Sequence, residues 1–188
     1  MTRGGTGHLP GIGMPPIALP STRGDRIRVD VVPPGFERLV IFAYPLTGLP
    51  GIESPPGWDE IPGARGCTAE SCGFRDHAAE LPGAGAAVVG LSTQSTAYQR
   101  EAAERLLLPY PLLSDAEHRL TSALRLPTFT AQVRPEHDGG GFRTLLERLT
   151  LVVRDGAIER VFYPVLTPEV HAEEVLARVR ADRQGGAL

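Results

Sequence analysis

Two continuous apolar runs constrain the fold of this chain more than any other feature. The first, RLVIFAY, covers residues 38–44 and is closed by Pro45, and the second, GAAVVGLS, ends at Ser92. Half-buried strands alternate apolar and polar residues, whereas strands buried on both faces of a sheet do not. These two runs therefore predict central strands of a sheet that is covered on both sides.

Segments with helical spacing follow both runs. Apolar residues recur every three or four positions in TAYQREAAERLL and AEHRLTSALRL, and a further helix is predicted from Cys67 to Leu81. The C-terminal segment TPEVHAEEVLARVRADR is typical of a helix with Thr167 as its N-cap and Pro168 at its first position. Helices and buried strands thus alternate along the chain.

Three further segments complete the predicted sheet. RIRVDVV has the alternation of a strand, LPYPLLSD predicts a short strand and a turn, and RLTLVVRDGAIERVFYPV predicts a hairpin around Asp155-Gly156. The Gly-rich segment RPEHDGGGF is interpreted as a flexible excursion. The order of elements predicts an α/β protein with a mixed central sheet flanked by helices on both faces.

A chain of 188 residues can bury one core, so we predict a single domain over residues 1–188. Residues 1–14 are rich in Gly and Pro and are expected to be flexible. Residues 46–65 have neither helical nor strand spacing, and a loop of this length is usually functional or packed on itself. We expect Trp58 to pin this loop to the body of the protein.

Composition limits the partners and the compartment. A net charge of −3 argues against nucleic acid and against an anionic membrane surface as partners. No apolar run reaches the length of about 18 residues that spans a bilayer, and MTRGGTGHLPGIGMPP lacks the apolar core of a secretory signal. A cytoplasmic location is predicted, where cysteine pairs are more often catalytic, redox-sensing or metal-binding than structural. The histidines lack metal-ligand spacing, so we predict no metal site.

The only two cysteines, Cys67 and Cys72, lie at the start of a predicted helix. The unpaired N–H groups and the dipole of a helix N-terminus favour a thiolate, which makes Cys67 a candidate nucleophile. In an intact helix, residues five apart have Cα atoms about 8–9 Å apart, whereas a disulfide needs about 4.4–6.8 Å. A disulfide between these cysteines would require the first turns to unwind, and Gly73 lowers the cost of unwinding.

The segment GCTAESC followed by GFRD resembles the active site of the Q-type peroxiredoxins, also called bacterioferritin comigratory proteins. PPIALPSTRGDRIRVD, RLVIFAYP, VVGLSTQS, LPYPLLSD and RLTLVVRDG resemble other segments of that family in the same order. The resemblance implies a thioredoxin-like fold and a thiol peroxidase that needs no haem, flavin or metal. It also implies hydrogen peroxide or an organic hydroperoxide as substrate, an external dithiol such as thioredoxin as reductant, and a monomer or homodimer.

The resemblance assigns roles to three residues. Cys67 corresponds to the peroxidatic thiol, which attacks the peroxide, and Cys72 to the resolving thiol, which closes an intrachain disulfide. Arg148 opens the RLTLVV strand and corresponds to the arginine that holds the thiolate and the peroxide oxygens. A planar cation with several donors suits that task. The alternative for Arg148 is a surface salt bridge.

The segment before Cys67 departs from the family pattern. The family has a proline and a threonine where this chain has Glu60 and Ala64. Pro45 follows the first core strand as the family proline does, so the resemblance implies an insertion at 46–65.

The threonine that orients the peroxide must then come from elsewhere. Thr47 could fold back to supply the hydroxyl, or Thr68 or the backbone amides of Arg65 and Gly66 could replace it.

Other functions and other side chains remain open from the residues alone. A thioredoxin-like disulfide oxidoreductase usually has C-x-x-C, which the spacing of Cys67 and Cys72 does not match. A redox-sensing binding module would use oxidation to remodel residues 46–65. Glu70 and Arg75 could orient the site or could be solvated neighbours on one helix.

Overall fold

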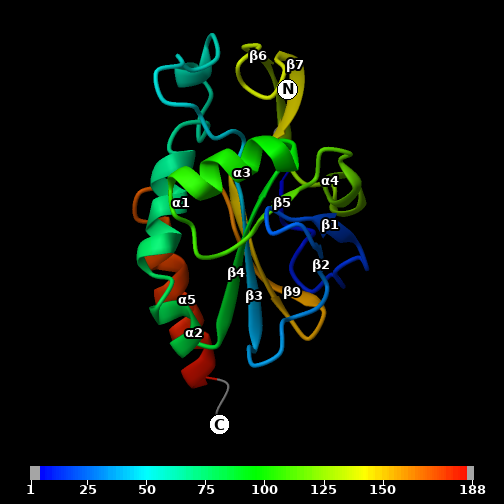
Figure 1. The fold of residues 1–188 in the computed structure, drawn as a ribbon. Helices are drawn as coiled ribbons and strands as arrows, with labels where there is room; N and C mark the ends of the chain where they lie inside the picture. Colours follow the sequence, from blue (N-terminus) through cyan, green and yellow to red (C-terminus); the bar gives the residue numbers. More distant parts are fainter. Residues whose placement is uncertain (1–4, 186–188) are drawn as a thin grey trace.

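The structure is a computed structural model that describes residues 5–185. Its centre is a five-stranded sheet in the order β5-β4-β3-β8-β9 (Figure 1). β3, β4 and β5 are parallel, β8 is antiparallel to β3, and β9 is antiparallel to β8. The strands are β3 (Arg38–Ala43), β4 (Ala86–Ser92), β5 (Leu112–Ser114), β8 (Leu149–Arg154) and β9 (Ala157–Phe162). The predicted α/β class, mixed sheet and 155–156 hairpin are confirmed.

Helices cover both faces of this sheet, as predicted. One face packs against a group of three helices, and α3 (Thr96–Arg105) runs next to β5. The three are α1 (Cys67–Asp76), α2 (Glu80–Gly83) and α5 (His171–Gly185). The other face packs against α4 (Arg119–Leu124) and the N-terminal segment, as Figure 1 shows. No helix within residues 5–185 is long and apolar enough to cross a bilayer.

The segment before β3 differs from the expectation in two respects. Residues 1–14 were expected to be flexible. Residues 1–4 lie outside the described residues, but Leu9 and Met14 are buried and the backbone N–H groups of Gly11 and Met14 donate to β9 and its turn. Within RIRVDVV only β2 (Arg26–Arg28) is a strand, paired with β1 (Ala18–Pro20). Prolines before β1 and at its end cannot donate to a ladder, so this pair stays short.

Two predicted helix boundaries are also wrong. The helix expected from Cys67 to Leu81 is divided into α1 and α2, because Pro82 in a continuous helix would clash with the carbonyl group four residues earlier. Thr167 is not the N-cap of the last helix. Residues 167–170 form a turn in which the Val170 N–H donates to the Thr167 carbonyl, and α5 begins at His171.

The Gly-rich segment is part of a hairpin rather than a flexible excursion. β6 (Thr128–Val133) and β7 (Gly141–Leu146) pair antiparallel on either side of it. The 46–65 loop packs on this hairpin in a third apolar cluster, in which the Trp58 ring lies 5.9 Å from the Phe129 ring. Trp58 opens the one-turn helix η1 (Trp58–Glu60) and is buried. It therefore pins the loop as expected, but to the hairpin.

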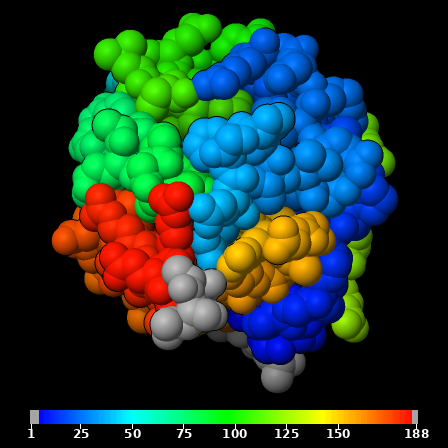
Figure 2. All heavy atoms as spheres, turned by 90° about the horizontal axis from the view of Figure 1, so that it is seen from below, coloured from blue at the N-terminus to red at the C-terminus, as the bar shows by residue number. Residues whose placement is uncertain are grey.

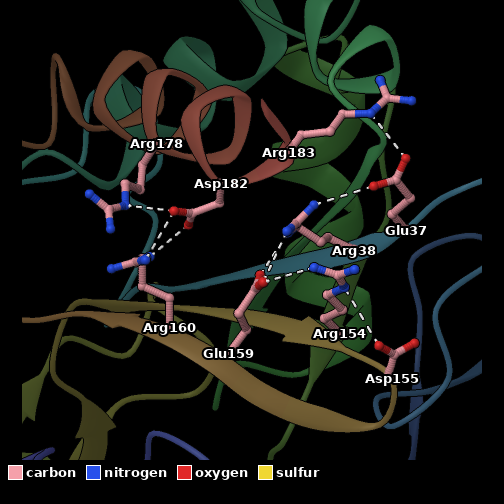
Figure 3. A network of polar contacts seen from close by, with 9 residues as sticks. All are labelled: Glu37, Arg38, Arg154, Asp155, Glu159, Arg160, Arg178, Asp182 and Arg183. Atoms are coloured by element: carbon pink, nitrogen blue, oxygen red, sulfur yellow. Dashed lines mark hydrogen bonds and ion pairs between the residues drawn. The ribbon is translucent and has the colours of Figure 1, made fainter. Parts of the chain in front are cut away.

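A network of ion pairs ties the end of α5 to the sheet (Figure 3). The Asp182 carboxylate pairs with Arg160 of β9 and with Arg178. Arg38, whose side chain has no exposed surface, pairs with Glu159 of β9, whose side chain is partly exposed. Figure 2 views this end of the molecule, where α5 (red) lies beside the segment before β3 (light blue) and the β8–β9 hairpin (orange). These contacts fix α5, and through it α1, against the sheet.

Candidate active site

Cys67 is the first residue of α1 and is 4% exposed. Gly66 before it has φ 93°, and a Cβ at that position would overlap the ring of Pro168. Glycine alone fits here, because it adopts the left-handed conformation without strain and has no Cβ to clash with Pro168. Cys72 is half-buried on the same helix, and both thiols are free. The cysteines therefore lie on one continuous helix, as the sequence predicted.

Arg148 directly precedes the first residue of β8, and its side chain reaches Cys67 from there. Its Nη2 donates to Cys67 Sγ at 3.1 Å and to the Arg65 carbonyl at 2.9 Å, and its Nε donates to the Gly63 carbonyl at 3.2 Å. Arg148 is only 3% exposed, so the surface salt bridge is the wrong interpretation. A buried guanidinium with fixed donors thus contacts the candidate nucleophile.

Glu70 lies one turn after Cys67 and shares the same arginine. Its Oε2 accepts from Arg148 Nη1, while its Oε1 is buried without a hydrogen-bond partner among the described residues. Burial raises the pKa of Glu70 to about 7, although Arg148 opposes that shift. Burial lowers the pKa of Arg148, but the charges of Cys67 and Glu70 outweigh it and leave that pKa raised. Glu70 is thus not a solvated neighbour.

The surroundings of Cys72 are cationic. The pKa of Arg75 is raised by its hydrogen bond with Asp76 and then by the nearby Cys72, and the pKa of Arg105 is raised first by its hydrogen bond with Glu101, with Cys72 as a further cause. Arg75 itself donates to the Leu106 carbonyl at 3.0 Å, so it lies on the Cys72 side of α1 rather than at Arg148. Arg75 and Arg105 thus lie near the thiol that would attack an oxidised sulfur.

Thr47 and Pro45 lie buried after the end of β3. The Thr47 N–H and Oγ1 both donate to Gln94 Oε1, at 3.0 and 3.1 Å, and the Thr47 carbonyl accepts from the Tyr98 hydroxyl at 3.0 Å. The Pro45 carbonyl accepts from Ser92 Oγ. Among the hydrogen bonds of residues 5–185, none joins Thr47 to Cys67 or Arg148, and the role of Thr47 stays a prediction.

The alternatives to Thr47 stand as follows. Thr68 is exposed on α1. The carbonyl of Arg65 is engaged by Arg148, and the carbonyl of Gly66 accepts from the backbone N–H of Glu70. The amides of these two residues also stay a prediction.

Sequence reasoning missed three residues that hold Thr47 and the 46–65 loop. Gln94 follows the carboxyl end of β4, a position typical of sites in parallel sheets, and that signal could have identified it. His137 from the Gly-rich segment contacts the Tyr98 hydroxyl at 3.0 Å through Nδ1 and the Glu53 carbonyl at 3.1 Å through Nε2. No local pattern predicts this bridge, because its partners lie far apart in the sequence.

Comparison with known proteins gives a consistent set of relatives. Residues 61–159, more than half of the chain, match the model of the AhpC/TSA family. A putative peroxiredoxin bcp from Coxiella burnetii is 24% identical over 88% of this chain and 94% of its own length. Peroxiredoxin Bcp from Escherichia coli is 27% identical over 84% of this chain and 86% of its own length. Chloroplastic peroxiredoxin Q from Arabidopsis thaliana is 32% identical over 65% of this chain, a match that spans 51% of that relative.

Solved structures agree with these relatives. The crystal structure of peroxidoxin BcpB from Mycobacterium tuberculosis superposes with a TM-score of 0.68 and 27% identity, covering 92% of this chain and 97% of that one. A structure of Xanthomonas campestris peroxiredoxin Q has a TM-score of 0.64 and 20% identity, covering 89% of this chain and 91% of that one, a likeness of fold alone.

Proposed function

This chain belongs to the AhpC/TSA family and is a thiol-dependent peroxidase on a thioredoxin-like fold, and we propose that Cys67 is its attacking thiol. The Q-type peroxiredoxin resemblance and the enzyme class predicted from the sequence are thereby confirmed. The family implies a hydroperoxide substrate and a thioredoxin-type reductant. The observation that carries the residue assignment is the 3.1 Å contact from Arg148 Nη2 to Cys67 Sγ.

In the first step, the Cys67 thiolate attacks the terminal oxygen of the peroxide. An S–O bond forms and the O–O bond breaks, which gives a sulfenic acid and an alkoxide or hydroxide that must gain a proton. The Arg148 guanidinium stabilises the thiolate and then the charge that develops on the leaving oxygen. Because Arg148 is already held by carbonyl groups on either side of Ala64, little reorganisation accompanies the reaction.

In the second step, the Cys72 thiol attacks the sulfenic sulfur of Cys67: an S–S bond forms, the S–O bond breaks, and the leaving hydroxide takes the thiol proton and departs as water. An external dithiol then reduces the intrachain disulfide. Both cysteines lie on α1, so the disulfide requires the turns between them to unwind. The half-buried position of Cys72 and its cationic neighbours support this role.

The remaining parts of the proposal rest on the family and on the composition of the chain. Thr47 orients the peroxide through its hydroxyl, Pro45 shapes the same end of β3, and residues 46–65 are an insertion. The protein works in the cytoplasm as a single-domain monomer or homodimer, without nucleic acid, membrane or cofactor.

One observation favours a second function, the redox-sensing module. Cys67 Sγ lies 3.6 Å from the carbonyl oxygen of Ala64, and Ala64 also belongs to the apolar cluster that holds the 46–65 loop. Oxidation of Cys67 would disturb that contact and change the loop surface. No comparable observation favours the disulfide oxidoreductase.

Peroxide consumption with a dithiol donor tests the proposal. We expect turnover in the wild type and none in Cys67→Ser, because a serine hydroxyl is not ionised at neutral pH. Asp76→Asn, an exposed change on the same helix, is the matched control and should keep full activity. Appreciable turnover in Cys67→Ser would refute the assignment, and a wild type that is oxidised once without turnover would favour the sensor.

A further inference from the structure

Two acidic groups share one buried cation at the start of α1. Arg148 gives Nη2 to Cys67 Sγ and Nη1 to Glu70 Oε2, so the two groups occupy the two terminal nitrogens of one guanidinium. Exposure is 4% for Cys67, 3% for Arg148 and 0% for Glu70. Water therefore does not screen these charges from one another.

At this buried site, the single positive charge of Arg148 can stabilise only one negative charge, either on Cys67 or on Glu70. A buried charge without a partner costs several kcal/mol, and two like charges at one site push one group to its neutral form. Glu70 Oε1 is buried and has no hydrogen-bond partner among residues 5–185, which suits a carboxyl oxygen that carries a proton. The raised pKa of Glu70 agrees with that arrangement.

Other groups that face Glu70 do not supply a second positive charge. The phenols of Tyr44 and Tyr110 are close enough for Glu70 to raise their pKa, after burial as the first cause, and both stay neutral. His171, at the start of α5, has a lowered pKa because of burial, an effect to which Arg148 adds. Among the described residues, Arg148 is thus the cation that the two acidic groups share.

The reaction proposed above changes the charge at this site. Thiolate attack turns Cys67 into a neutral sulfenic acid, so Arg148 loses an anionic partner at the moment when the leaving oxygen needs a proton. A carboxyl group on the same guanidinium can meet both needs by giving up its proton.

We propose that Glu70 is the proton source of peroxide reduction: it is neutral while Cys67 is a thiolate and becomes a carboxylate as Cys67 becomes a sulfenic acid. The step is Cys67–S⁻ + ROOH + Glu70–COOH → Cys67–SOH + ROH + Glu70–COO⁻. The sulfur is oxidised by two electrons, the O–O bond is reduced, and Arg148 keeps one anionic partner throughout. This inference rests on the proposed role of Cys67.

Infrared difference spectroscopy of the Cys72→Ser variant, in which the sulfenic acid persists, tests this inference. Treatment with one equivalent of peroxide at about pH 6.5 should remove the C=O band of one protonated carboxyl group. The band loss should vanish in Glu70→Gln and persist in Asp76→Asn, each combined with Cys72→Ser.

The outcomes separate the two proposals. Gain of one oxygen by Cys67 without loss of the carboxyl band would overturn the role of Glu70 and leave the peroxidase intact. No gain of oxygen would overturn the role of Cys67 itself.

The pH profile of Cys67 oxidation distinguishes a proton source from a structural support. Above the pKa of Glu70, we expect the wild-type rate to fall about tenfold per pH unit, as for a general acid. Glu70→Gln should be slower at neutral pH and independent of pH in that range, because an amide neither ionises nor gives up a proton. A slower Gln variant with the wild-type profile would mean that Glu70 only holds Arg148.

Discussion

At the scale of single residues, the position of Cys67 depends on Gly66. Its φ of 93° and the closeness of Pro168 leave no room for a Cβ, so the turn into α1 packs directly against the turn that precedes α5. The resemblance identified Cys67 and Arg148, and the structure brings them together. The burial of Glu70 was not predictable, because it depends on an arginine 78 residues away.

Gly66→Ala should lower the free energy of unfolding by about 2–4 kcal/mol, because a left-handed alanine is strained and its Cβ overlaps Pro168. We also expect slower oxidation of Cys67, since the first turn of α1 must shift. Chemical denaturation and single-turnover oxidation measure the two effects. Gly48→Ala, at an open position with ordinary φ, is the control, and equal stability of the two variants would contradict the packing at Gly66.

Glu70 should also make stability depend on pH. Its pKa is raised by burial above the unfolded value of about 4.3. The folded state therefore binds more protons between that value and about pH 7, and the free energy of unfolding falls as pH rises through this window. Glu70→Gln lacks this loss, so its stability relative to the wild type should increase by on the order of 1–3 kcal/mol from pH 5 to pH 8. A pH-independent difference between the two proteins would mean that Glu70 is already ionised at pH 5.

At the scale of elements, α1 and α5 support one another near both cysteines. A Cβ at Gly73 would lie 3.4 Å from Ala172 Cβ, which shows that α1 and α5 approach closely at this position. The ion pairs in Figure 3 hold the other end of α5. The apolar run RLVIFAY predicted β3 but not that Arg38, at its start, is buried against Glu159.

Glu159→Gln should destabilise the protein by about 2–4 kcal/mol, because it leaves the buried Arg38 guanidinium without its closest carboxylate. Glu37→Gln removes the other partner of Arg38, which is 43% exposed and 3.4 Å away, and should cost less than about 1 kcal/mol. Urea unfolding of both variants compares them. If the two changes cost the same, the Arg38–Glu159 pair does not secure this end of the sheet.

Disulfide formation should be visible as local unwinding of α1. Hydrogen exchange across residues 67–76 should be faster in the oxidised protein, whereas β3 should stay protected in both forms. Exchange followed by mass spectrometry on reduced and oxidised protein measures this. Equal protection of 67–76, with the disulfide verified, would show that the cysteines meet without unwinding.

At the scale of the whole molecule, the protein combines the five-stranded sheet with a smaller cluster, which the β6–β7 hairpin and the 46–65 loop form together. The strand and helix order was predictable because apolar runs and periodicity are local properties. The β6–β7 hairpin was missed although TFTAQV alternates as a half-buried strand does. The contact of this hairpin with the 46–65 loop was not predictable, because the Trp58–Phe129 packing joins segments about 70 residues apart.

The mass of the intact protein before and after one equivalent of hydroperoxide tests the cysteine roles on which the proposed mechanism depends. The wild type should lose two hydrogens as the Cys67–Cys72 disulfide forms, and Cys72→Ser should gain one oxygen on Cys67. Cys67→Ser should remain unchanged under the same treatment. Gain of an oxygen by Cys72 in the Cys67→Ser variant, at the wild-type rate, would contradict Cys67 as the attacking thiol.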